Sequence, residues 1–236
     1  MVILYNLLRG RIEPGIIHLF GPAATGKTTI AICCAAGIAS LGRACAWIDT
    51  AKGFSAKRFA TISTTTTGKD YSSRILLNTA TTPLAVEHAI EQLTSSMKKW
   101  QVGLLVLDTA FGSIDQTIQD PAIRRVMWVQ ARDHLARLAL LAATSKIPFI
   151  IINTIGYKPG QDQERPTGEQ IVRACNPEDA VVRPIIGTEG YSGRFTFVSY
   201  DDETEYEIVD GGIHQKATHV APGGPVDDDE EAEATD

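Results

Sequence analysis

The chain of 236 residues has few cysteines, few aromatic residues and no long apolar run. Its four cysteines form no C-x-x-C pair, and no histidine lies at zinc-ligand spacing from them, which argues against a zinc site or a redox motif. Reduced thiols are expected, as in cytoplasmic proteins. No apolar run approaches the roughly 20 residues that span a bilayer, and the N-terminus lacks a signal-peptide pattern. The sequence therefore predicts a cytoplasmic location and no membrane partner.

The formal charge of −6 is unevenly distributed along the chain. Residues 227–236 hold seven acidic residues and no basic one, whereas the remaining 21 acidic and 22 basic residues nearly cancel. With 44% hydrophobic and 21% charged residues, the chain as a whole is not of the disordered class. We expect one core domain over residues 1–220 and a disordered acidic tail over 221–236. The near-neutral body neither requires nor excludes a nucleic-acid partner.

Short apolar segments alternate with helical segments through the first two thirds of the chain. An apolar segment between turn residues predicts a buried strand, and apolar residues at helical spacing predict a helix. Strands that are apolar on both faces and alternate with helices are typical of a parallel sheet covered on both sides. Strands are predicted over 16–20, 44–49, 75–78, 102–108 and 149–153, and helices over 27–41, 55–62, 83–99 and 121–144.

The pattern changes after the polar segment 156–168. Strands are predicted over 179–186, 194–200 and 205–209 without helices between them, which favours an antiparallel meander at the C-terminal edge of the sheet. The threonine-rich segment 61–68 is polar, and we expect a loop there. The whole pattern predicts an α/β fold with a mostly parallel central sheet covered by helices and with antiparallel strands at one edge.

The segment between the first strand and the first helix matches G-x-x-x-x-G-K-[ST], the phosphate-binding loop. Its glycines allow backbone N–H groups to turn inward, and these groups and the helix N-terminus favour an anion. Lys27 is expected to reach the β- and γ-phosphates, and Thr28 to ligate Mg²⁺ together with Asp108, the acid that ends an apolar strand. The expected nucleotide-binding residues are Gly21, Pro22, Ala23, Ala24, Thr25, Gly26, Lys27, Thr28 and Thr29.

Several segments resemble one family, the RecA/RadA-type recombinase ATPases. Residues 46–59 contain Ile-Asp-Thr followed by Gly-Phe-Ser and Arg-Phe, similar to the family's Y-I-D-T-E-G-x-F-x-x-x-R-F. Residues 147–153 (IPFIIIN) resemble its I-P-V-I-V-I-N-Q strand. Further similar segments are LLRGRIEPG at 7–15, GPAATGKTT at 21–29, LVLDT at 105–109, PTG at 166–168 and GGI at 211–213.

This resemblance covers about residues 4–214. In its overall arrangement the chain is most similar to the short archaeal RadB paralogues of this family. It implies a P-loop NTPase fold with a RecA-like core, ATP and Mg²⁺ as cofactors, and DNA as a partner, single-stranded rather than double-stranded. It further implies an accessory role in homologous recombination and DNA repair, beside the main recombinase or a junction nuclease. A KaiC-like regulatory ATPase that does not act on DNA is the alternative, and a degenerate ATPase kept as a binding partner is a third possibility.

Two positions depart from the family where hydrolysis is concerned. Ala51 stands where the family has the glutamate that orients the attacking water, and alanine cannot accept a proton or align water. Thr154 stands where the family has a glutamine that senses the γ-phosphate. A third departure is Glu169, where the family usually has glycine. We expect nucleotide binding with weak or absent hydrolysis, at most a weak DNA-dependent ATPase. The alternative is that Asp49 or a carboxylate of a neighbouring subunit replaces the missing glutamate.

DNA contacts in such a fold are expected from two loops that follow strands, at about 111–125 and 156–168. Their cations would neutralise phosphates and give salt-dependent, sequence-independent binding, and a tyrosine could stack on a base. The second loop also carries two acidic residues, so an ordinary solvated loop remains the competing interpretation. The residues expected to contact DNA are Arg124, Arg125, Tyr157, Lys158 and Arg165.

Overall fold

The computed structural model describes residues 13–114, 118–156, 165–184, 191–197, 202–209 and 211–215. Strand and helix alternate as far as β5, and strands dominate after it. The helices are α2 (Lys27–Ser40), α3 (Ala56–Thr67), η1 (Ser72–Arg74), α4 (Pro83–Ser96), α5 (Pro121–Ser145) and α6 (Glu169–Arg173). The strands are β1 (Gly15–Gly21), β2 (Ala44–Asp49), β3 (Ile75–Thr79), β4 (Val102–Asp108), β5 (Pro148–Gly156), β6 (Arg165–Pro166), β7 (Glu178–Pro184), β8 (Tyr191–Phe197), β9 (Asp202–Val209) and β10 (Gly212–Gln215).

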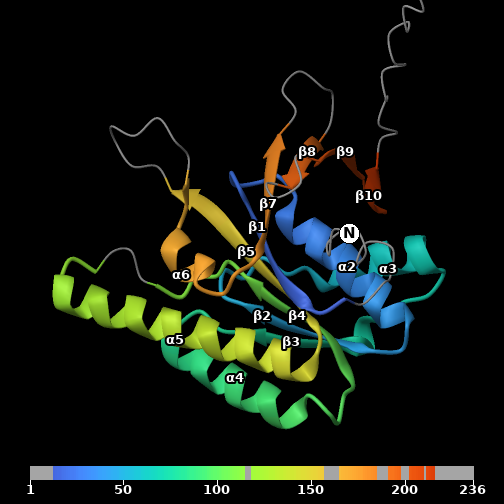
Figure 1. The fold of residues 1–236 in the computed structure, drawn as a ribbon. Coiled ribbons are helices and arrows are strands. Elements are labelled where there is room, and N and C mark those ends of the chain that lie inside the picture. The colour runs from blue at the N-terminus through green and yellow to red at the C-terminus, as the bar shows by residue number, and fades with distance from the viewer. Residues whose placement is uncertain are drawn as a thin grey trace, which may run out of the picture.

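The strands form one sheet in the order β10-β9-β8-β7-β1-β5-β4-β2-β3, and β6 pairs separately with β5. Pairing is parallel from β7 through β1, β5, β4 and β2 to β3, and antiparallel from β7 through β8 and β9 to β10. Helices lie on both faces of the parallel part (Figure 1). The predicted α/β fold, with a mostly parallel sheet and antiparallel strands at one edge, is confirmed.

The first strand of the predicted meander joins the parallel and antiparallel parts of the sheet. β7 runs parallel to β1 on one side and antiparallel to β8 on the other, and β9 and β10 continue the antiparallel meander. The short elements β6 and α6 lie between β5 and β7 and return the chain to the end of the sheet where β1 begins. Both elements are too short for hydrophobic periodicity to predict them. The later strands also begin earlier than expected, at Tyr191 and Asp202.

Two apolar cores lie on opposite faces of the sheet. Helices α2 and α3 enclose one, and α4 and α5 enclose the other (Figure 1). Alternate residues of β5 serve the two cores: Ile150 and Ile152 pack with the α2 side, and Phe149 and Ile151 with the α5 side. All four are buried, which explains why this strand is apolar on both faces. Trp47 is fully buried in the first core.

The threonine-rich segment is helical, so its prediction as a loop was wrong. Helix α3 continues to Thr67 and ends at Gly68, whose φ of 77° gives a left-handed cap. The hydroxyl of Thr66 donates to the Ile62 carbonyl at 2.7 Å, one turn earlier. Ile62 is buried in the first core. Tertiary packing and these local hydrogen bonds therefore outweigh the weak helix propensity of threonine.

The parallel strands give the sheet two distinct edges. At their carboxyl ends lie the P-loop after β1, residues 50–54 after β2, Asp108 in β4 and Thr154 in β5. Open α/β sheets bind ligands at this edge. At the amino ends lie the turns that lead into β2, β4 and β5. Among the described residues, no helix combines the length and apolarity needed to cross a membrane.

Candidate functional site

The P-loop has the backbone that its glycines predict. Gly26 has a φ of 90°, a left-handed conformation that a side chain would strain, and it precedes the first residue of α2. The Gly26 carbonyl accepts the first intrahelical hydrogen bond, from Ile30 at 2.9 Å. The N–H groups of the first helical turn therefore point into the loop, where they can bind an anion.

Lys27 lies folded within this loop. Its side chain is buried, and Nζ donates to the Gly21 carbonyl at 3.0 Å and also to the Pro22 carbonyl. Burial lowers the pKa of Lys27 to about 8, and the nearby Asp108 carboxylate partly opposes this shift. Because burial makes the charged form of Lys27 unfavourable, a phosphate bound beside the ammonium would offset that cost.

Thr28 and Asp108 meet as the sequence predicted. The Thr28 hydroxyl donates to the two carboxylate oxygens at 3.2 and 3.4 Å, although 80 residues separate the pair. Asp108 is 2% exposed, and its pKa is raised to about 6, first by burial and then by the charge of Asp49. Hydrogen bonds from Thr28 and Thr109 and the charge of Lys27 act in the opposite direction.

These two side chains fit a magnesium ion that is bound together with phosphates. Mg²⁺ prefers oxygen ligands and is usually held by one or two protein groups plus substrate phosphates and water. Thr28 supplies a hydroxyl and Asp108 a carboxylate at the mouth of the loop. The part of the chain that the structure describes contains no group of three or more histidine, cysteine or acidic residues that could hold a metal by itself.

Ala51, at the position of the family's glutamate, belongs to a loop that lies beside Asp108. A Cβ placed on Gly53 would be 3.7 Å from Asp108 Oδ2, so residues 50–54 border the predicted magnesium site. Thr50 fixes this loop, because its hydroxyl donates to the Asp108 carbonyl at 3.0 Å. Ala51 and Lys52 are exposed. The position of the family's glutamate is therefore close to the site, but its side chain is only a methyl group.

Asp49 is engaged by its own loop. Its buried carboxylate accepts backbone N–H groups from Ala51 and Gly53 at 3.1 Å each and from Phe54 at 2.9 Å. These three hydrogen bonds hold both oxygens against the backbone and shape the turn. Asp49 thus acts as a structural acceptor, which weakens the alternative that it replaces the missing glutamate.

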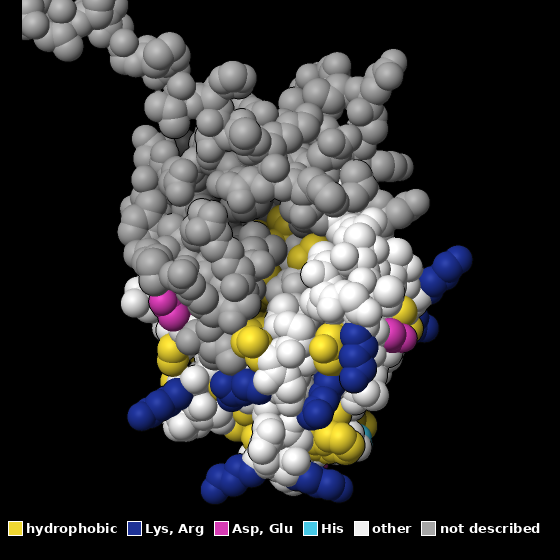
Figure 2. Space-filling view, turned by 90° about the vertical axis from the view of Figure 1, so that its right-hand side faces the viewer, with side chains coloured by type: hydrophobic (Ala, Val, Ile, Leu, Met, Phe, Trp, Pro, Cys, Tyr) yellow, Lys and Arg dark blue, Asp and Glu magenta, His cyan; other side chains and the backbone are white. Residues whose placement is uncertain are grey.

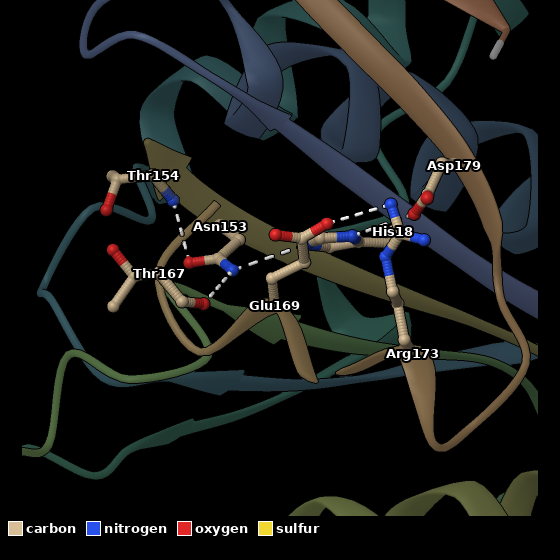
Figure 3. Close-up of polar contacts among 7 residues, drawn as sticks. All are labelled: His18, Asn153, Thr154, Thr167, Glu169, Arg173 and Asp179. Carbon is tan, nitrogen blue, oxygen red and sulfur yellow. Dashed lines mark hydrogen bonds and ion pairs between the residues drawn. The ribbon is translucent and has the colours of Figure 1, made fainter. Parts of the chain in front are cut away.

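Thr154 lies opposite Gly21 in the register of β5 and β1, at the edge of the P-loop. Its N–H donates to Asn153 Oδ1 at 2.8 Å, and its carbonyl accepts from Thr167 N–H at 2.9 Å. The Asn153 amide donates back to the Thr167 carbonyl at 2.7 Å (Figure 3). The two ends of the predicted second DNA loop are thereby tied together below the P-loop.

A buried polar chain continues from this tie across the sheet. Asn153 Nδ2 lies 3.2 Å from His18 Nε2, and His18 Nδ1 lies 2.9 Å from Asp179 Oδ1 (Figure 3). The three side chains come from the adjacent strands β5, β1 and β7. Both ring nitrogens of His18 are engaged, so this histidine has a structural role in the sheet.

The predicted DNA-contacting residues are unequally available. Arg124 is half-buried and turns onto the backbone, with Nη2 donating to the Ile118 carbonyl at 2.6 Å. Arg125 is exposed. Arg165 is also exposed, and its guanidinium lies 4.0 Å from the carboxylate of Glu169, which pairs more closely with Arg173. Tyr157 and Lys158 lie outside the described residues.

Two residues of the site were not predicted. A cavity of about 290 Å³ beside the P-loop is lined by residues 24–29 together with Arg58 of α3 and Ile208 of β9. Arg58 had a signal, because it lies in the first turn of a helix capped by Ser55, close after the carboxyl end of β2. Ile208 had none, since only the sheet order brings a residue of β9 to the P-loop.

Comparison with known proteins agrees with this geometry. The chain superposes on a crystal structure of the RadB recombinase with a TM-score of 0.69, covering 89% of this chain and 95% of the other. The chain has the fold of the RadB recombinase. Sequence identity is 21%, a level at which the likeness establishes the fold alone. This P-loop fold implies nucleotide binding. No family model matches the chain, and no curated protein matches it in sequence.

Proposed function

We propose that this chain is a RadB-like accessory protein of homologous recombination and DNA repair that binds ATP with Mg²⁺ and binds DNA but hydrolyses ATP weakly or not at all. The observation that carries the proposal is a contrast within one site. The groups that bind phosphate and metal, Lys27, Thr28 and Asp108, are assembled, whereas the adjacent loop presents Ala51 where catalysis needs a carboxylate.

Nucleotide binding follows from the P-loop. The phosphates would lie on the N–H groups before α2 and on Lys27, whose buried charge they would neutralise. Thr28 and Asp108 would hold Mg²⁺, which would neutralise part of the phosphate charge. The base would lie toward Arg58 and Ile208, which line the same cavity. A guanidinium and an aliphatic side chain suit the two faces of a purine.

Weak hydrolysis follows from Ala51, Thr154 and Asp49. Ala51 cannot align or deprotonate the attacking water, and Thr154 lacks the amide of the family's sensor. Asp49 already accepts three backbone hydrogen bonds, so it is poorly placed to substitute. Loss of a positioned general base typically lowers the rate by about 10²–10⁴-fold. Binding would persist, because none of the phosphate-binding groups is altered.

DNA binding is supported by the resemblance and by the position of the loops. Arg125 and Arg165 are exposed near segments that follow the carboxyl ends of β4 and β5. Nucleotide-dependent movement at this edge would reach the second loop through Thr154 and Thr167, whose backbones are hydrogen-bonded. The fold match is to a protein described as a recombinase, and recombinases act on DNA.

The decisive experiment measures binding and turnover separately. Binding of a fluorescent ATP analogue with Mg²⁺ should be saturable and should be lost in Lys27→Ala. Phosphate release should stay near the background of Lys27→Ala, with or without single-stranded DNA. Phosphate release well above that background would overturn the proposal of weak hydrolysis. Binding of a single-stranded oligonucleotide with ATP, with ADP and without nucleotide, over a salt series, tests the DNA partner against the regulatory ATPase alternative.

A further inference from the structure

A group of basic residues lies at the sheet edge opposite the P-loop. Arg43 precedes β2, Lys98 and Lys99 lie between α4 and β4, and Lys146 precedes β5. Because β2, β4 and β5 are adjacent and parallel, the four residues lie at the same edge of the sheet although they are distant in sequence. We refer to these four residues as the amino-edge basic cluster.

The positive charge of this cluster is not neutralised by its surroundings. None of its four residues forms an ion pair within the part of the chain that the structure describes. The segments that carry the four residues, 14–48, 92–107 and 134–161, contain no acidic residue, and the acidic residues at the same edge, Glu13, Asp70 and Glu178, precede or begin β1, β3 and β7. Figure 2 faces this side of the molecule, with basic side chains spread over the surface and acidic ones at its margins. The cluster is therefore a local excess of charge on a nearly neutral body.

A cavity of about 510 Å³ lies within the cluster, between the ends of α4 and α5. Arg43 and Lys98 line it, together with the apolar side chains of Met97 and Val102. Arg43 is held in this wall, because its Nη2 donates to the Val102 carbonyl at 2.9 Å. Its side chain also lies across Gly103, where an added Cβ would come within 2.8 Å of Nε. The glycine thus provides the space that this arginine occupies.

An exposed aromatic ring borders the same surface. Trp100 is 40% exposed, and Lys99 Nζ lies 5.6 Å from its ring centroid. The turn that presents the ring is fixed by hydrogen bonds from Trp100 N–H to the Ser96 carbonyl and from Gln101 N–H to the Lys98 carbonyl, at 3.1 and 3.2 Å. A large apolar ring left exposed among cations suits stacking with a base while the cations bind the backbone.

We propose that the amino-edge basic cluster and Trp100 form a second contact surface for single-stranded nucleic acid, separate from the DNA contacts proposed at the carboxyl ends of the strands. Lysines at the ends of α4 and α5 also interact favourably with the helix dipoles. That effect does not explain why Arg43 is held in place by the Val102 carbonyl or why the Trp100 ring is exposed. An acidic peptide would satisfy the charges but would leave the ring without a stacking partner.

The test is binding of the full chain to a fluorescent oligothymidylate over a salt series, with and without ATP. Lys98→Gln/Lys146→Gln should reduce the slope of log affinity against log salt by about 1.4, because each lost contact to a single strand removes about 0.7. The matched control, Lys57→Gln/Arg132→Gln, removes two exposed cations on α3 and α5 and should leave the slope unchanged. Trp100→Ala should weaken binding roughly tenfold, the range of one lost stacking contact.

Two further variants separate this surface from others. Gly103→Ala displaces Arg43 without changing the net charge, and it should weaken binding while the melting curve reports whether the fold is kept. Arg125→Gln/Arg165→Gln alters the opposite edge. If this pair abolishes binding and Lys98→Gln/Lys146→Gln has no effect, the inference is overturned and the proposed function stands. If the wild-type chain binds no oligonucleotide, both fail. If the peptide DDDEEAEATD binds to this surface and the oligonucleotide does not, the inference is overturned in favour of an acidic partner.

Discussion

Ala51 donates its backbone N–H to the carboxylate of Asp49 at 3.1 Å. Ala51 stands at the position of the family's glutamate, and Asp49 is the carboxylate that could have replaced that glutamate, so the first residue helps to hold the second in place. The loop is thereby held in place beside Asp108, with an exposed methyl group where a water-orienting group is needed. The same contact keeps Asp49 turned toward its own backbone. The proposed weak hydrolysis thus follows from the structure of the loop as well as from the single substitution.

Restoring the carboxylate should restore turnover. Ala51→Glu places an acid on an exposed backbone position next to the proposed magnesium site, and we expect phosphate release to rise by about 10²-fold or more, the contribution of a positioned base. Ala51→Gln is the matched control, because it has a similar size without the carboxylate. Equal rates for the two variants would show that the missing glutamate does not limit hydrolysis.

Asp108→Asn should stabilise the chain without nucleotide and abolish the Mg²⁺ dependence of ATP binding. Burial raises the pKa of Asp108 to about 6 from an ordinary value of 3.8, so the ionised form is less favourable in the folded state than in the unfolded state. Ionisation therefore costs stability as pH rises from about 4 to 6, on the order of 3 kcal/mol at pH 7. Denaturant unfolding at pH 7 should show the gain, and it should vanish below about pH 4. A loss of stability at pH 7 would contradict this account.

The polar tie below the P-loop should control the second loop. Asn153→Ala removes the donor that reaches both the Thr167 carbonyl and His18 Nε2, and it should cost about 1–3 kcal/mol, the penalty for unsatisfied buried groups. Hydrogen exchange should increase in residues 165–173 more than in α4. His18→Phe leaves the Thr167 contact intact and should spare that segment. Uniform exchange changes in both variants would indicate a purely global effect.

Two glycines allow the energetic cost of backbone strain to be measured apart from the cost of close packing. Gly168 and Gly42 both have left-handed φ values, 63° and 80°. A Cβ on Gly168 would lie 2.5 Å from Phe111 and 3.0 Å from Trp128, whereas nothing lies within 4 Å of one on Gly42. Gly42→Ala should cost about 1 kcal/mol of unfolding free energy for strain alone. Gly168→Ala should cost more, by about 1–3 kcal/mol for overpacking. Equal costs in chemical denaturation would contradict the close contact.

Residues 21–29 and Asp108 could be predicted from sequence because their chemistry is encoded locally. The P-loop is contiguous, its glycines have backbone roles, and an apolar strand that ends in an acid is identifiable in one segment. The alternation of strands and helices gave the fold class for the same reason. The loop prediction at 61–68 failed, because packing of Ile62 and threonine-to-backbone hydrogen bonds outweighed local composition.

Sequence alone determined the P-loop motif, the alanine at position 51 and the parallel core. The tertiary structure decided which distant residues share a surface. Sheet order brought Ile208 to the P-loop and assembled Arg43 and Lys146 at the opposite edge. The pairing of β7 with β1 placed Asp179 beside His18. Local patterns specify strands and turns, whereas long-range pairing between strands sets their neighbours, and those neighbours create the unpredicted contacts.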